Sequence, residues 1–122
     1  MTKEEKEILL QWIEKASHDF METYNGMNKN EVIQILKKLQ PDLNSKYGLS
    51  SLALFGSVAR GEEQVASDID VLIDLEENTS ANFFNIAFLL QDTFYPVKVD
   101  IVSRKGIKPA YFNAIAKELI YV

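Results

Sequence analysis

The stretch that decides the fold is Leu54-Phe55-Gly56-Ser57-Val58-Ala59-Arg60-Gly61, followed closely by Ser67-Asp68-Ile69-Asp70-Val71-Leu72. The apolar run 52–55 ends at Gly56-Ser57, as expected for a buried strand that leads into a tight turn. Residues 68–74 are rich in β-branched side chains and partly alternate, which predicts a second strand. The two predicted strands are therefore separated by a turn and a polar loop.

Helices are predicted before this unit. Residues 4–24 place apolar side chains at steps of three and four between charged ones, the spacing of an amphipathic helix. A second helix is predicted to begin at a cap formed by Asn28 or Asn30. It ends near Pro41 or continues toward Tyr47.

After the second strand, residues 81–94 carry apolar side chains at helical spacing, residues 97–102 alternate as a third strand, and residues 108–119 indicate a last helix. Residues 58–61 are expected to form one helical turn. With only three convincing strands, the order predicts an α+β domain in which helices cover a small mixed β-sheet, with an extra N-terminal helix.

Composition limits the classes of function. The chain has 122 residues, 47% of them hydrophobic, which predicts one compact domain. Cysteine is absent and histidine occurs once, which argues against thiolate catalysis and against Cys- or His-based metal sites. The net charge of −5 argues against a long nucleic acid as partner. No apolar run of membrane-spanning length and no secretory signal is visible, so we expect a cytoplasmic protein without a membrane partner.

The acidic residues of the predicted strands are the strongest indication of chemistry. Asp68 and Asp70 are two positions apart on a strand, so their side chains should share one face. Asp100 lies within the third predicted strand and joins them if that strand is adjacent. Clustered carboxylates repel one another unless a cation lies among them, and Mg²⁺ is the cation that prefers carboxylate and phosphate oxygens.

The Gly56-Ser57 turn is a candidate phosphate site. Glycine allows the backbone to approach an anion closely, and the following amides and the Ser57 hydroxyl can bind anionic oxygens. Arg60, one helical turn further on, is positioned either to contact phosphate or to pair with Glu62, Glu63 or Asp68. Each motif is common by itself, and only the combination is specific.

Together with Val99-Asp100-Ile101-Val102, these motifs resemble the minimal nucleotidyltransferase family within the DNA polymerase β-like superfamily. The resemblance covers residues 28 to about 120. It implies a nucleotidyltransferase fold and Mg²⁺-dependent transfer of a nucleotidyl group from ATP or another nucleoside triphosphate, with pyrophosphate released and two metal ions. It further implies that Asp68, Asp70 and Asp100 are the catalytic metal ligands and that Gly56 and Ser57 bind the nucleotide.

Many short members of that family are antitoxins that attach AMP to a tyrosine of a small helical HEPT-type toxin, so the resemblance implies such a partner for this chain. Residues 27–122 are interpreted as the nucleotidyltransferase domain and residues 1–26 as an N-terminal helical extension. The alternative is a non-catalytic antitoxin that neutralises its partner by direct contact. A third interpretation is self-modification with the N-terminal segment as acceptor, and a homo-oligomer is compatible with the sequence.

Overall fold

A computed structural model of the chain describes residues 2–8, 28–62 and 68–122. Residues 3–8 are helical, and the remainder of the helix predicted over 4–24 lies outside the described residues. The other elements, in chain order, are α2 (Lys29–Tyr47), β1 (Leu49–Phe55), α3 (Gly56–Ala59), β2 (Ile69–Leu75), the 3₁₀ turn η1 (Ser80–Asn82), α4 (Phe83–Phe94), β3 (Val99–Ser103), α5 (Pro109–Ile115), the 3₁₀ turn η2 (Ala116–Glu118) and β4 (Ile120–Tyr121).

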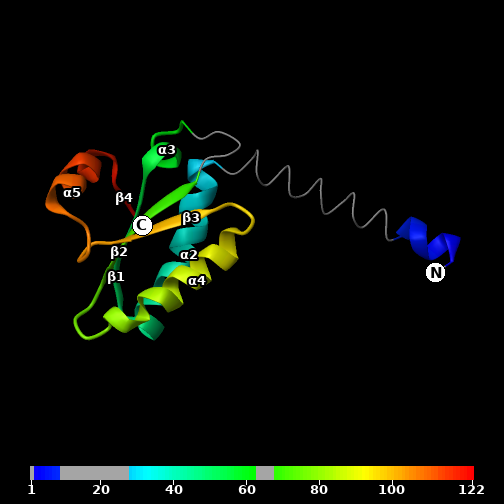
Figure 1. The fold of residues 1–122 in the computed structure, drawn as a ribbon, viewed down its shortest axis with the longest axis horizontal. Coiled ribbons are helices and arrows are strands. Elements are labelled where there is room, and N and C mark those ends of the chain that lie inside the picture. The colour runs from blue at the N-terminus through cyan, green and yellow to red at the C-terminus, as the bar shows by residue number, and fades with distance from the viewer. Residues whose placement is uncertain (1, 9–27, 63–67) are drawn as a thin grey trace.

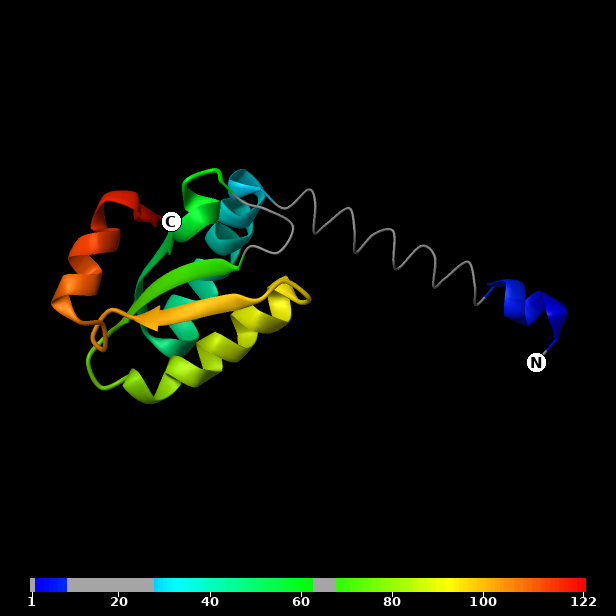
Figure 2. The same ribbon diagram turned by 45° about the horizontal axis from the view of Figure 1, so that its top comes forward.

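The strands form one mixed sheet in the order β3-β2-β1-β4. Strand β1 is antiparallel to both β2 and β4, whereas β2 and β3 are parallel and joined through α4. Figure 2 shows β2 and β3 side by side with α4 beneath them. The predicted α+β class with a small mixed sheet is confirmed.

The C-terminal region differs from the prediction. The helix expected over 108–119 ends at Ile115, a 3₁₀ turn follows, and Ile120 and Tyr121 then form the edge strand β4 against β1. A strand of two residues has no periodicity to detect, and its pairing depends on a partner more than 60 positions earlier in the chain. Because of this strand, residues 120–121 lie at the edge of the sheet, next to β1.

Helix α2 continues past Pro41 to Tyr47, the longer of the two predicted lengths. Asn28 caps the helix by accepting a hydrogen bond from the Glu31 amide at 3.0 Å, and Gly48 ends it with a φ of 75°. Pro41 lies inside the helix, yet the helix continues to Tyr47. Buried leucines on both sides of the proline, Leu36 and Leu43, keep one continuous face against the sheet, and that burial outweighs the missing hydrogen bond.

The core occupies both faces of the sheet unequally. Helices α2 and α4 cover one face, as Figure 1 shows, and α5 lies at the other. The larger cluster includes Leu36, Leu54, Ile73, Leu90 and Phe94, all at most 1% exposed. The smaller cluster beneath α5 consists of Ala53, Phe55, Leu72 and Ile115. Among the helices that the structure describes, none is long and apolar enough to span a membrane.

Candidate active site

The parallel pairing of β2 and β3 settles the placement of the third aspartate. Asp70 is directly opposite Asp100 in the register of these strands, and Asp68 immediately precedes β2. Neighbouring strands lie about 4.8 Å apart, and residues opposite one another point to the same face. The three aspartates singled out in the sequence are therefore brought to one end and one face of the sheet.

Asp68 and Asp100 lie close together, and both pair with the Lys98 side chain. The ammonium Nζ of Lys98 is 3.9 Å from Oδ2 of Asp68 and 3.4 Å from Oδ1 of Asp100. Burial raises the pKa of Asp68, and a hydrogen bond with Asp100 and the negative charge of that carboxylate raise it further. Lys98 opposes these effects only in part. The raised pKa means that Lys98 does not fully compensate for burial and for the neighbouring carboxylate.

Asp70 is the most perturbed carboxylate of the group. Burial, followed by repulsion from Asp100, Asp68 and Glu118, raises its pKa from 3.8 to about 6. Its carboxylate also lies against the backbone of Gly56, where an added Cβ would collide with Oδ2 and lie 2.9 Å from Cγ. The glycine therefore allows the Gly56-Ser57 turn and the Asp70 carboxylate to occupy adjacent space.

The turn predicted at Gly56-Ser57 is present, and the helical turn expected over 58–61 is formed two residues earlier, by α3. Gly56 adopts a φ of 78°, which side-chain-bearing residues rarely adopt, and α3 starts at once. Within the described part of the chain, neither the amides of Ser57 and Val58 nor the Ser57 hydroxyl donates a hydrogen bond. The turn thus presents unused donors beside the carboxylates, an arrangement suited to phosphate oxygens held near a cation.

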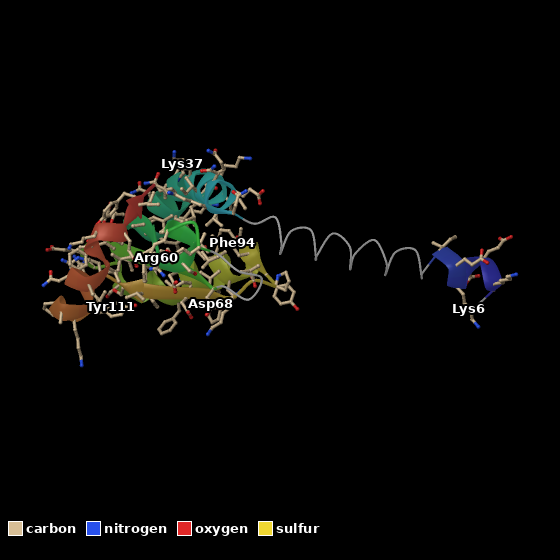
Figure 3. All side chains as sticks on the ribbon, turned by 90° about the horizontal axis from the view of Figure 1, so that it is seen from above. Lys6, Lys37, Arg60, Asp68, Phe94 and Tyr111 are labelled. Atoms are coloured by element: carbon tan, nitrogen blue, oxygen red, sulfur yellow. The ribbon has the colours of Figure 1, made fainter. Side chains whose placement is uncertain are left out.

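Arg60 is paired with two carboxylates. Its Nη1 donates to Oε2 of Glu118 at 2.7 Å and its Nε to Oε2 of Glu62 at 3.0 Å, and the hydrogen bond to Glu118 is the main cause that raises the pKa of Arg60. Of the pairings considered from the sequence, that with Glu62 is present, and Glu63 lies outside the described residues. Figure 3 shows the Arg60 and Asp68 side chains in the same part of the domain.

Two neighbours of the site were not predicted from the sequence. Glu118 accepts a hydrogen bond from the Gly56 amide at 3.1 Å in addition to the one from Arg60. It is 62 positions from Gly56, and no local pattern reveals such a contact. Lys98 is exposed and directly precedes β3, and its ammonium lies within 4 Å of two of the aspartates.

The three aspartates offer the oxygen donors that a divalent cation prefers. In the described ranges, no three Asp, Glu or His side chains converge on a common point as they stand, because Asp70 faces Gly56 while Asp68 and Asp100 face Lys98. The donor set nevertheless suits a hard cation: three carboxylates at one sheet end, two of them with raised pKa values, and one lysine as the counter-charge. A bound cation would remove the repulsion among these carboxylates.

Comparison with known proteins agrees with this description. Residues 30–122 match the family model described as "Nucleotidyltransferase domain". A relative from Methanocaldococcus jannaschii, "Putative protein adenylyltransferase MJ1379", is 38% identical over 96 residues, which are 76% of this chain and 96% of the relative. "Protein adenylyltransferase MntA" of Thermococcus cleftensis is 29% identical over 92 residues, 75% of this chain and 93% of that protein.

Two solved structures share the fold. A "putative minimal nucleotidyltransferase" superposes with a TM-score of 0.62 at 31% identity, covering 74% of this chain and 92% of that one. A "toxin-antitoxin with AMP-PNP" superposes with a TM-score of 0.55 at 20% identity, covering 77% of this chain and 71% of the other. The second likeness extends to the fold alone.

Proposed function

The chain belongs to the nucleotidyltransferase domain family and is a nucleotidyltransferase, and from that premise we propose that it is a protein adenylyltransferase that moves AMP from ATP to a hydroxyl of a partner protein. The observation that carries the proposal is the placement of Asp70 opposite Asp100, with the Gly56 turn against Asp70. Carboxylates and unused phosphate donors then flank one space. The names of the relatives at 38% and 29% identity support protein as the acceptor class.

Each residue has a part in the proposed reaction. Asp68, Asp70 and Asp100 would hold Mg²⁺, as two ions, which supplies the positive charge that nucleotide and carboxylates share. The Ser57 hydroxyl and the adjacent amides bind oxygens of the triphosphate, and Arg60 offers its remaining donors there. The acceptor oxygen forms a bond to the α-phosphorus, the bond from that phosphorus to pyrophosphate breaks, and the proton of the acceptor hydroxyl passes to water.

The different exposure of the three carboxylates supports different roles for them. The side chain of Asp100 is 44% exposed and that of Asp68 38%, whereas Asp70 lies against Gly56. The open Asp100 is suited to the side from which a protein hydroxyl approaches, and Asp70 to the side of the triphosphate. We assign Asp100 to the acceptor and Asp68 and Asp70 to the nucleotide on this basis.

The acceptor is proposed to be a tyrosine of a small helical HEPT-type toxin, with this chain as the antitoxin. The support is the resemblance of the motifs together with a fold shared with a toxin–antitoxin structure. Residues 27–122 are proposed to form the catalytic domain and residues 1–26 an extension outside the part that matches the family, which begins at residue 30.

The competing proposal is an antitoxin that acts by contact without catalysis. An exposed surface on α4 is compatible with it: Phe84 and Phe88 lie one turn apart and are 67% and 69% exposed, which suits contact with another protein. Such a surface also suits an enzyme that holds a protein substrate. The two proposals differ only in whether the partner becomes modified.

The experiment combines the chain, Mg²⁺, ATP labelled at the α-phosphate and the protein encoded by the neighbouring reading frame. Intact mass spectrometry should show the partner heavier by one AMP, on tyrosine. The Asp70→Asn variant should bind the partner and transfer no label. A stoichiometric complex of wild-type chain and unmodified partner would establish the contact mechanism, and label on the chain alone would indicate self-modification.

A further inference from the structure

The contact that the proposed reaction leaves unexplained is the bridge made by Glu118. One carboxylate oxygen accepts from the Gly56 amide at 3.1 Å and the other accepts from Nη1 of Arg60 at 2.7 Å. The side chain is only 22% exposed. Both oxygens of Glu118 therefore accept hydrogen bonds from the Gly56-Ser57 region, one from the Gly56 amide and one from Arg60.

The position of Glu118 is set by the edge strand. Ile120 and Tyr121 pair with Leu54 and Ala53 of β1, the strand that ends at the Gly56 turn. Val122 continues the pairing by donating to the Leu52 carbonyl at 3.0 Å. Glu118 comes two residues before β4, so the C-terminal segment delivers its carboxylate back to the end of β1.

A carboxylate at this place needs a reason, because three aspartates lie nearby and a triphosphate is expected there. Negative charge beside a polyanion opposes binding. On charge alone, removal of Glu118 would strengthen nucleotide binding. On geometry, its removal would free the Gly56 amide and release Arg60 from its stronger partner. The two effects have opposite signs, so an experiment can separate them.

We propose that Glu118 is a positioning residue for the triphosphate, holding the Gly56-Ser57 turn and the Arg60 guanidinium in the arrangement that receives phosphate oxygens. This inference rests on the proposed function. Because the Gly56 amide is already occupied, the donors left for the nucleotide are those of Ser57, Val58 and the remaining nitrogens of Arg60. Glu118 fixes both ends of that set without touching the nucleotide.

Glu62 provides a matched control. Its side chain also pairs with Arg60, at 3.0 Å, but it is 65% exposed, and among the described residues the Gly56 amide donates to Glu118 instead. Glu62→Ala removes one negative charge near the same arginine and leaves the bridge to the turn intact. Glu118→Ala removes the bridge, and Glu118→Gln keeps an acceptor of the same shape without the charge.

The test is equilibrium binding of a non-hydrolysable ATP analogue with Mg²⁺, measured by calorimetry on the whole chain. Glu118→Ala should bind about ten- to a hundredfold more weakly, the range of a lost charge-assisted hydrogen bond. Glu118→Gln should lie between wild type and Glu118→Ala, and Glu62→Ala should stay within about twofold of wild type. In the transfer assay the KM for ATP should rise more than kcat falls.

Wild-type or tighter binding by Glu118→Ala would overturn the inference, and if that variant does not fold, wild-type or tighter binding by Glu118→Gln would do so. A failure here is distinguishable from failure of the proposed function. If the wild-type chain modifies its partner while Glu118→Ala binds nucleotide normally, only the role of Glu118 is refuted. If the wild-type chain binds the analogue and modifies no protein, the acceptor assignment fails, while the binding measurements still decide the role of Glu118.

Discussion

Gly56→Ala tests the packing of the turn against Asp70. The substitution adds one carbon at a position with a φ of 78°, where it would collide with the Asp70 carboxylate. Gly61→Ala is the matched control, because Gly61 has a φ of 70° and no described atom lies within 4 Å of an added Cβ. The two variants share the backbone strain and differ in the collision.

The magnitudes follow from these two contributions. A left-handed conformation costs an alanine roughly 1–2 kcal/mol, partly offset by about 0.4–1 kcal/mol from the stiffer unfolded chain. Gly61→Ala should therefore lower the free energy of unfolding by about 1 kcal/mol. In Gly56→Ala the Asp70 side chain must also move, which adds about 1–3 kcal/mol, the usual cost of inserting a methyl group into a filled space. We expect a total loss of about 2–4 kcal/mol.

The assay is urea unfolding of both variants without metal, repeated in an Asp70→Ala background. With Asp70 truncated, the extra cost of Gly56→Ala should disappear, giving a coupling energy of about 1–3 kcal/mol, whereas Gly61→Ala should remain additive. Nucleotide transfer should fall about a hundredfold in Gly56→Ala, as expected when a reacting group moves by about 1 Å. Equal destabilisation by both alanines, with coupling below about 0.5 kcal/mol, would refute the contact between Gly56 and Asp70.

Three further predictions concern charge, metal and the scaffold. Because the pKa of Asp70 is raised from 3.8 to about 6, the folded metal-free protein binds more protons than the unfolded chain between about pH 4 and pH 6, and its stability should fall as pH rises through that range. Asp70→Asn should remove about 1–2 kcal/mol of this loss, after discounting for solvent screening. Urea unfolding of both proteins at pH 4 and pH 7 in EDTA measures the difference, and parallel pH profiles of the two proteins would contradict the prediction. Lys98→Met should destabilise the metal-free chain by about 0.2–1 kcal/mol and enlarge the rise in melting temperature on adding Mg²⁺. Melting temperatures that match those of the wild type with and without the ion would count against Lys98 as the counter-charge. Asn28→Ala should lower the free energy of unfolding by about 1 kcal/mol, because the cap of α2 is lost. Nucleotide transfer per folded molecule should be unchanged, and altered transfer kinetics would mean that α2 acts on the site.

The parts of the site within one strand were accessible from the sequence. The spacing of Asp68 and Asp70 implies a shared face by strand periodicity alone, and the apolar run before Gly56 identifies the turn. The placement of Asp100 needed the pairing of β2 with β3, which depends on how α4 packs against β3 and shares a core cluster with β2. Spacing in the chain carries no information about that pairing, and the family resemblance supplied it instead.

Long-range contacts account for what was missed. Glu118 reaches Gly56 because β4 pairs with β1, and neither β4 nor its pairing has a detectable pattern. The continuation of α2 past Pro41 depends on the burial of Leu43 against the sheet, a tertiary effect that outweighs the local preference of proline. In both cases energy from packing between distant segments decided a local outcome.

The register of β2 with β3 also limits how this gene can change length. Successive side chains of a strand point to opposite faces of the sheet. Gaining or losing one codon between Val97 and Asp100 would therefore turn the carboxylate to the face that α4 covers. A change of two codons would restore the face but displace the group by about 6–7 Å along the strand. Insertions and deletions should therefore be purged from this short segment and accepted far more readily in the exposed turn 76–78.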